Sequence, residues 1–349
     1  MTNIYLVKIL LLSAGAFILA ASWNPFLLRF LRKYNMGKQI RNGGNTPIFS
    51  ELHAGKAGTP TMGGLLIWVT VLVMTLTIYY SSKLFGWPWL EFANFLSRKE
   101  TLMPLGVLVA TALVGLFDDW LDVRRKGVLG GGGLTIKHRL LIYTLIAAFG
   151  AWWFYFKLDW DTFHIPFYGD IQLGWSYIII FIFVIVATAF SVNETDGLDG
   201  LAGGTLLTSF AAYGLIAFIE QRYDLATFCG VIVGALLAFL WFNITPAKYF
   251  MGDTGAMSLG VTLGVIAMLT NSALILPLVG SIFVLESFSV IIQLISKKIR
   301  GKKVFISSPI HHHFEAKGWT EANIVMRFWV IAQISAALGL VLFLLDKQF

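Results

Sequence analysis

The sequence predicts an all-α, polytopic membrane protein with about ten transmembrane helices, and three observations support this fold class. Hydrophobic residues make up 57% of the 349 residues and charged residues only 13%, whereas soluble domains carry about 25% charged residues. Apolar runs long enough to cross about 30 Å of hydrocarbon recur along the chain. Lysine and arginine collect in alternate loops between these runs, as in membrane proteins of fixed orientation.

The apolar runs are taken as one integrated membrane domain over residues 1–349, because no stretch without them is long enough to fold separately. The first run has no convincing cleavage site and is interpreted as a retained helix rather than a signal peptide. The expected spans are residues 4–28, 62–80, 102–117, 139–157, 175–192, 201–219, 226–243, 254–271, 273–295 and 325–346.

Positive charge predicts the orientation of these spans. If the N-terminus faces outward, the inner loops hold 19 of the 26 lysines and arginines. Both termini are therefore expected on the periplasmic side. The net charge of +7 forms no single patch, so it indicates topology and anionic lipid headgroups rather than nucleic acid. Cys229, the one cysteine, lies in an apolar run and excludes an internal disulfide.

One outer loop and five inner loops contain distinctive sequence. The outer segment WDTFHIPFYGDIQLGW alternates aromatic and polar residues around Gly169-Asp170, which is typical of a short hairpin on the membrane surface. The inner loops contain KAGTPTMGG, FDDWLD, VNETDGLDGLAGG, YFMGDTG and SPIHHHFE.

Three carboxylates follow the third apolar run in FDDWLD. On a continued helix Asp118 and Asp122 lie one turn apart on the same face, with Asp119 beside them. Like charges this close repel one another, and a divalent cation or a cationic substrate would relieve the repulsion. A solvated helix end balanced by Arg124 and Arg125 explains the same residues as well.

Asn193, Asp196 and Asp199 recur every three residues in NETDGLDG, so a continuous helix would place them roughly on one face. Asn and Asp are good N-caps, but three such residues exceed what capping needs. Asp253, in FMGDTG, lies at the expected start of an apolar helix. There it either caps the helix or holds a cation that bridges to phosphate.

His311, His312 and His313 are consecutive in PIHHHFE. Adjacent histidines point in different directions and structural zinc prefers spaced ligands with Cys, so phosphate binding or proton handling is preferred over zinc or a plain polar loop. Lys56 and Thr61 precede a helix in KAGTPTMGG. This stretch suits a phosphate-contacting loop but lacks P-loop spacing, and a structural loop explains it equally well.

The co-occurrence of these motifs on one side of the membrane is more informative than any one of them. Carboxylates with hydroxyl, lysine and histidine groups suit a magnesium diphosphate site, because Mg²⁺ usually bridges carboxylates to substrate phosphate. Such a site could join a water-soluble nucleotide to a lipid phosphate. A transporter would place ionisable groups near mid-membrane, and a scaffold leaves the motifs unexplained.

These motifs resemble those of the polyprenyl-phosphate N-acetylhexosamine-1-phosphate transferase superfamily, and within it the phospho-N-acetylmuramoyl-pentapeptide transferases. The resemblance extends from Gly58 to Trp319 and is carried by GTPTMGG, DDWLDV, VNETDGLDGLAGG, FMGDTGAMSLG and SPIHHHFEAKGW. PIHHHFE discriminates best, because the sister enzymes that use UDP-N-acetylglucosamine have a different, shorter His motif.

The resemblance implies transfer of phospho-N-acetylmuramoyl-pentapeptide from UDP-N-acetylmuramoyl-pentapeptide to undecaprenyl phosphate, giving lipid I and UMP, with Mg²⁺. This is the first membrane step of peptidoglycan synthesis, in the bacterial inner membrane with the active site facing the cytoplasm. The implied partners are the two substrates and membrane lipid; a homodimer is left open. A sister transferase that uses UDP-N-acetylglucosamine is the alternative.

By the same resemblance the catalytic residues are Asp118, Asp119, Asp253 and His311. Asp118 is the base that deprotonates the lipid phosphate, and Asp253 with Asp119 holds the metal. The residues implied to contact substrate are Lys56, Thr61, Lys137, Asn193, Asp196, Asp199, Asn243, Phe250, His311, His312 and His313.

Two positions depart from the family pattern. Glu194 stands where an apolar Leu is usual, so this turn is expected to be more acidic and wetter. Arg139 stands where Lys is frequent, and because the two are not equivalent at phosphate, the roles of Lys137 and Arg139 stay open.

Direct attack is favoured over an aspartyl-phosphate intermediate, because a lipid phosphate is already nucleophilic.

Overall fold

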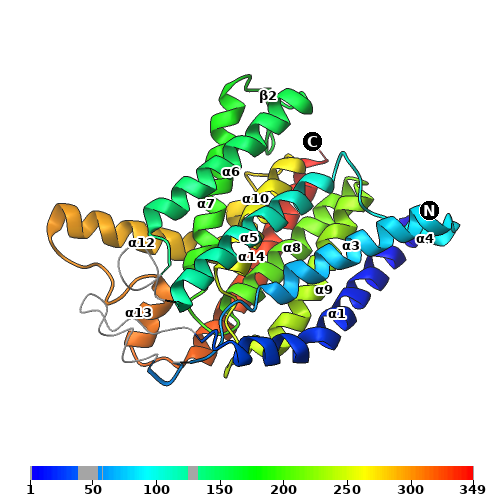
Figure 1. Ribbon diagram of the computed structural model, residues 1–349. Coiled ribbons are helices and arrows are strands. Elements are labelled where there is room, and N and C mark those ends of the chain that lie inside the picture. Colours follow the sequence, from blue (N-terminus) through cyan, green and yellow to red (C-terminus); the bar gives the residue numbers. More distant parts are fainter. Residues whose placement is uncertain (1, 38–53, 57, 125–132, 349) are drawn as a thin grey trace.

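The computed structural model describes residues 2–37, 54–56, 58–124 and 133–348, which form a helical bundle with one short hairpin (Figure 1). Eight helices in the described residues are long and apolar enough to cross a membrane, which confirms a polytopic membrane protein. They are α1 (Thr2–Lys33), α3 (Leu65–Phe85), α5 (Leu102–Val123), α6 (Ile136–Lys157), α7 (Ser176–Thr195), α8 (Leu201–Ile219), α9 (Tyr223–Asn243) and α14 (Glu321–Asp346).

Two of the ten expected spans take a different form. The run expected at 254–271 is α10 (Asp253–Leu269), which has 17 residues and is buried from Thr254 onward. The run expected at 273–295 is divided at Gly280 into α11 (Leu276–Val279) and α12 (Ser281–Arg300). After this break α12 leaves the bundle and extends to the left in the view of Figure 1. Shorter elements are η1 (Ala54–Lys56), α4 (Pro88–Ala93) and α13 (Ile310–Ala316).

α10 is the central helix of the bundle and packs mainly against α5 and α7. Small residues permit this close packing. A Cβ atom on Gly115 of α5 would lie 2.3 Å from the carbonyl oxygen of Asp253, so only glycine fits there. The first turn of α10 is therefore held against the end of α5, which brings the FMGDTG and FDDWLD motifs together.

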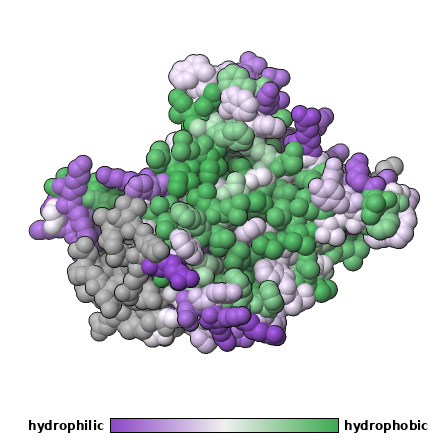
Figure 2. Space-filling model, viewed as in Figure 1, coloured by the Kyte–Doolittle hydropathy of each residue, from purple (hydrophilic) through white to green (hydrophobic). Residues whose placement is uncertain are grey.

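The surface has the polarity expected for contact with lipid. Apolar residues cover the middle of the face seen in Figure 2, and polar residues gather toward its edges. Large apolar side chains such as Leu10, Phe149 and Phe183 are 60%, 60% and 71% exposed. Exposure on this scale indicates lipid contact rather than water contact.

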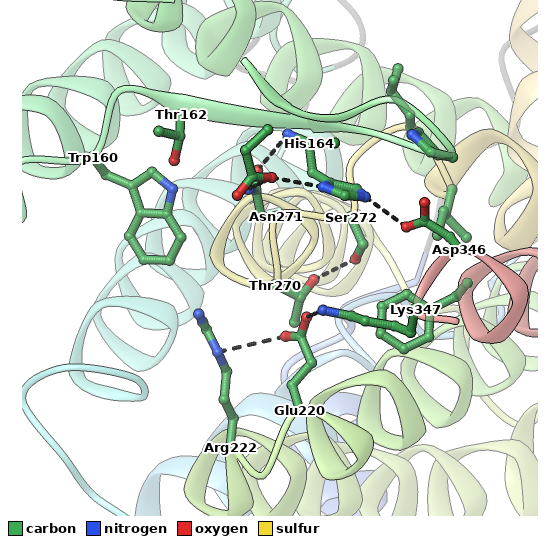
Figure 3. A pocket seen from close by; sticks show the side chains of 16 residues that line it. Trp160, Thr162, His164, Glu220, Arg222, Thr270, Asn271, Ser272, Asp346 and Lys347 are labelled. Atoms are coloured by element: carbon green, nitrogen blue, oxygen red, sulfur yellow. Dashed lines mark hydrogen bonds and ion pairs between the residues drawn. The ribbon is translucent and has the colours of Figure 1, made fainter. Parts of the chain in front are cut away.

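The hairpin expected between 160 and 175 is present and consists of β1 (Thr162–Ile165) and β2 (Gly169–Gln172), paired antiparallel. It lies over the last turn of α14 (Figure 3). The His164 ring joins the hairpin to α14, because its Nδ1 lies 2.7 Å from Asp170 Oδ1 and its Nε2 lies 2.6 Å from Asp346 Oδ2. Beside it lies a polar pocket where Glu220 pairs with Arg222 and Lys347.

The His164 contacts predict a pH-dependent contribution to stability. Burial lowers the pKa of His164, but its bonds to Asp170 and Asp346 raise it further, so the pKa lies above its ordinary value. A raised folded-state pKa gives stability that is present in full below about pH 6.5 and is lost as the pH rises through the folded pKa.

We therefore expect His164→Gln to lower the melting temperature most near pH 6 and progressively less toward pH 9, measured in detergent. His138→Gln, which removes an exposed histidine of α6, is the control. A deficit for His164→Gln that stays constant between pH 6 and pH 9 would contradict the assignment.

Candidate active site

The acidic motifs meet where α5 and α7 end and α6 and α10 begin. At their centre Arg139 Nε lies 2.9 Å from Asp118 Oδ2, and Arg139 Nη2 lies 2.7 Å from Asp253 Oδ2. Arg139 Nη1 donates to Asn193 Oδ1 at 3.0 Å, and Asn193 Nδ2 donates to Asp253 Oδ1 at 2.6 Å. We call these four residues the Arg139 cluster. Two carboxylates share one guanidinium, so the cluster has a net negative charge.

Lys137 does not join the Arg139 cluster. Its side chain lies two residues before Arg139 on α6, is exposed and makes no ion pair with the described residues, whereas the Arg139 side chain is 19% exposed. A planar guanidinium can contact two carboxylates and an amide at once, which an ammonium group does less well. Of the two basic residues whose roles stayed open, the geometry places Arg139 at the acidic groups.

Asp118 belongs to the last turns of α5, because this helix continues to Val123. Its side chain is fully buried, with one oxygen accepting the Leu134 amide and the other paired with Arg139. Asp122, one turn later, accepts the Gly133 amide at 3.0 Å. Asp118 and Asp122 thus both hold the backbone that leads into α6.

Asp119 faces the start of α10 instead. Its two oxygens accept the amides of Asp253 and Thr254, each at 3.0 Å, and Thr61 Oγ1 lies 3.4 Å from Oδ1. The first amides of a helix lack partners within it and carry its positive dipole end, so a carboxylate satisfies both needs. This placement favours a capping role for Asp119 over direct contact with a metal.

The NETDGLDG stretch is not one continuous helix. α7 ends at Thr195 and α8 begins at Leu201, so Asp196 and Asp199 lie in the loop between them. Asp196 Oδ2 accepts the Gly252 amide at 3.2 Å. The three residues still act at the same end of the bundle, but through turns rather than through a shared helix face.

Asp199 belongs to a second charged group with Lys56 and Glu321. Lys56 Nζ lies 2.7 Å from Asp199 Oδ1 and 2.5 Å from Glu321 Oε1. The Lys56 ammonium also lies 5.9 Å from the centre of the half-buried Phe250 ring. Sequence reasoning missed Glu321, because Thr320-Glu321 before an apolar run is an ordinary helix start.

Asn243 links two backbone segments beside Lys56 and Asp199. Its Oδ1 accepts the Gly200 amide at 2.9 Å, and its Nδ2 donates to the Tyr249 carbonyl at 2.8 Å. These bonds tie the start of α8 to the backbone that precedes Phe250. Asn243 therefore positions the loops around the site, whatever it contacts in a substrate complex.

The three consecutive histidines have three different partners. His311 Nδ1 lies 2.9 Å from Glu286 Oε2, and His312 Nδ1 lies 2.6 Å from Glu315 Oε2. His313 Nδ1 accepts the Ile306 amide at 3.2 Å. The rings diverge as expected for adjacent residues, and Glu286 is a partner that the sequence did not indicate.

The Mg²⁺ site expected from the sequence would be formed by oxygen atoms of the Arg139 cluster. No group of three or more His, Cys, Asp or Glu side chains converges on a metal position within the part of the chain that the structure describes. Mg²⁺ needs only one or two carboxylates together with substrate phosphates and water. Asp253, 15% exposed beside the Asn193 amide, offers hard oxygen atoms of this kind, so the residues fit Mg²⁺ carried with a phosphate ligand.

Gly252 supplies a stability test of the Asp119 cap. Its φ of +73° favours glycine, and a Cβ would lie 2.6 Å from Asp119 Oδ2 and 2.7 Å from Thr61 Oγ1. We expect Gly252→Ala to displace the Asp119 carboxylate and to destabilise the protein by about 1–3 kcal/mol, the cost of unpaired buried amides. Thermal unfolding in detergent measures this.

Gly86→Ala is the matched control, because Gly86 also has a positive φ, +60°, and a Cβ there meets nothing within 4 Å. Gly252→Ala should have a clearly lower melting temperature than the control variant. Equal melting temperatures would show that the cap does not depend on space at Gly252.

Comparisons with known proteins identify the family of the chain. A family model described as glycosyl transferase family 4 matches residues 101–271, and a signature described as phospho-N-acetylmuramoyl-pentapeptide-transferase signature 1 matches residues 56–67. The first model contains the whole Arg139 cluster, and the second contains Lys56 and Thr61.

Curated relatives match nearly the full chain, and three named phospho-N-acetylmuramoyl-pentapeptide-transferase illustrate this. The Bacillus cytotoxicus protein is 39% identical over 335 residues, with 95% of this chain and 97% of the relative covered. The Anoxybacillus flavithermus protein is 40% identical with the same coverage. The Geobacillus sp. protein is 39% identical over 93% of this chain and 94% of its own. The chain therefore belongs to the phospho-N-acetylmuramoyl-pentapeptide-transferase family.

Proposed function

We propose that this protein transfers phospho-N-acetylmuramoyl-pentapeptide from its UDP derivative to undecaprenyl phosphate, giving lipid I and UMP with Mg²⁺. The names of the relatives support this reaction over the sister reaction with UDP-N-acetylglucosamine. The observation that carries the proposal is the Arg139 cluster, which joins two carboxylates from different helices beside the start of α10. Phosphoryl transfer needs such charge placement more than covalent help.

The proposed topology has ten spans, with α10 and the α11–α12 pair added to the eight long helices. α1 ends in Arg32-Lys33, and α12 ends in Lys297, Lys298 and Arg300. Basic residues of this kind mark cytoplasmic helix ends. The site would then face the cytoplasm of a bacterial inner membrane, with both termini outside. Lys38, Arg41, Arg125 and Lys126, which the charge pattern also assigned inside, lie outside the described residues.

The lipid substrate would approach along α7. An apolar pocket lies between α7 and the α11–α12 break, and Phe183, Val184, Pro277 and Phe283 help to line it. Ser191 also lines the pocket and lies two residues before Asn193 of the Arg139 cluster. A prenyl chain in this pocket would therefore extend toward the carboxylates that we assign to its phosphate.

The nucleotide would occupy the side of the site nearer α14. Lys56 and Phe250 offer a cation and an aromatic face, and the polar residues proposed to contact the substrate are Thr61, Asn193, Asp196, Asp199 and Asn243. On this proposal His311, His312 and His313 would form the remaining wall. Lys137, exposed on α6, is placed to meet the incoming anionic substrates rather than the reacting atoms. All these residues belong to one chain, so the proposal does not depend on a homodimer.

The proposed chemistry is one displacement at phosphorus. An oxygen of the lipid phosphate forms a bond to the sugar-bearing phosphorus of the UDP substrate, and the bond from that phosphorus to the bridging oxygen breaks and releases UMP. Asp118 accepts any proton on the attacking phosphate, and Arg139 orients the phosphates that meet beside it. Asp253 would hold Mg²⁺, which supplies neutralisation of the diphosphate charge.

The surroundings of Asp118 support direct attack. Both oxygens are already engaged, one by the Leu134 amide and one by Arg139. A carboxylate held on both sides is poorly placed to attack phosphorus itself. The Leu134 amide keeps one oxygen engaged, and the oxygen paired with Arg139 can accept a proton when the guanidinium turns to the substrate phosphates.

The acidic residues supply the main test. With Mg²⁺ and both substrates, Asp118→Asn and Asp253→Asn should each lower UMP release by about 100-fold or more, because each removes a charge that acts on the reacting phosphates. Chelating the metal with EDTA should have a comparable effect on the unaltered protein.

Asp224→Asn is the control, because Asp224 pairs with Lys8 outside the proposed site. Near-normal UMP release by both site variants would refute the assignment. UMP release from UDP-N-acetylglucosamine, but not from the pentapeptide nucleotide, would instead favour the sister reaction.

The two basic residues of α6 can be separated in the same assay. Arg139→Gln leaves the Asp118 and Asp253 carboxylates without their shared cation, so UMP release should fall roughly 100-fold. Lys137→Gln removes an exposed charge and should change the rate by only about twofold. The reverse order of effects would show that Lys137 is the phosphate contact.

A further inference from the structure

Glu286 is a buried carboxylate in an otherwise apolar part of α12. It lies in the run FVLESF and is 0% exposed, while its neighbours Leu285 and Phe288 are 45% and 57% exposed. A charged group in such a helix is costly and usually has a function. Its Oε2 faces His311 Nδ1 at 2.9 Å, and His311 is also 0% exposed.

The His311 ring is held in one orientation. Its Nδ1 faces a carboxylate, so Nδ1 bears a proton and Nε2 is the nitrogen that can gain or lose one. Among the described residues, Nε2 has no hydrogen-bond partner, and neither does Glu286 Oε1. A Cβ on Gly197 would lie 2.2 Å from Nε2, so this nitrogen abuts the loop that contains Asp196 and follows Asn193.

α12 also carries the segment that leads to His311. Gln293 Oε1 accepts the amides of Val304 and Phe305, and Gln293 Nε2 donates to the Phe305 carbonyl at 2.8 Å. Glu286 and Gln293 thus hold the segment from 304 to 311 against one helix. The orientation of His311 relative to the NETDGLDG loop depends on these contacts.

We infer that Glu286 is a positioning residue for the proposed transferase reaction: it accepts the Nδ1 proton of the His311 ring and holds the ring as an imidazolium, whose Nε2–H faces the NETDGLDG loop, beside which the substrate phosphates would lie. The inference rests on the proposed function. Glu286 itself touches no substrate and acts only through His311.

The charges around His311 agree with this role. Glu286 faces it from α12 and Glu194 from α7, while Glu315 and His312 belong to its own helix. Burial lowers the pKa of His311, but the three carboxylates raise it further, so it lies above the ordinary value. The ring therefore remains an imidazolium at higher pH and loses its charge as the pH rises through that pKa.

The pH profile of UMP release tests the inference. Glu286→Gln keeps the shape of the side chain and an acceptor for Nδ1–H but removes the charge. We expect the alkaline limb of the turnover profile to move to lower pH by about one unit or more. Ser287→Ala, which removes the neighbouring bond to Ser191 without changing charge, should leave the midpoint in place.

The outcomes separate the two claims. No UMP release by the unaltered protein refutes the proposed function. UMP release with the same alkaline midpoint in Glu286→Gln refutes the role of Glu286 while leaving the function intact.

A measurement on the unaltered protein covers the case in which Glu286→Gln fails to fold. With ¹⁵N-labelled histidine and His311→Gln to assign the signals, the Nδ1 resonance of His311 should report a protonated nitrogen from pH 6 to pH 9. An unprotonated Nδ1 would overturn the inference.

Discussion

The Arg139 guanidinium, shared between Asp118 and Asp253, is the interaction on which the rest of the site depends. Each carboxylate comes from a different helix, and Asn193 joins them from a third. Without a shared cation, two carboxylates this close would repel, and the ends of α5 and α10 would be driven apart. Close packing at Gly115 holds the same helices together from inside the bundle. Charge and packing therefore specify one arrangement.

The adjacent residues Asp118 and Asp119 show how one motif can serve two purposes. Successive side chains of a helix point about 100° apart, so one carboxylate faces Arg139 while the other faces the start of α10. Asp119 meets backbone amides that no substrate can replace, and its work is to hold Asp253 in place. Asp118 accepts one backbone amide, from Leu134, but its other oxygen is paired with the Arg139 side chain, which is not part of the backbone. That difference is the reason for proposing Asp118 as the catalytic residue and Asp119 as a supporting one.

Hydropathy and charge predicted the bundle well, because a membrane span must be apolar along its whole length. They also predicted the hairpin and which loops would be polar. The expected spans at 175–192 and 201–219 lie close to α7 and α8, but hydropathy did not predict the break at Gly280, because the stretch around it has a composition that also suits a helix. Such breaks are decided by packing and by the loops on either side.

The site was predictable only in part. The sequence motifs identified Asp118, Asn193 and Asp253, because acidic and amide residues beside apolar runs are conspicuous. They did not identify Glu286 or Glu321, because each is distant in sequence from its partner, His311 or Lys56. The choice between Lys137 and Arg139 also required the structure, since it depends on which face of α6 turns toward the carboxylates.

A double-mutant cycle between Arg139→Gln and Asp253→Asn, read as rates of UMP release, tests most directly whether these residues act as one unit. If Arg139 and Asp253 act through each other, the loss in the double variant should fall short of the summed single losses by at least about 1 kcal/mol, as for residues in contact. Losses that add to within about 0.5 kcal/mol would show that the two residues act independently, and the shared guanidinium would then not organise the site.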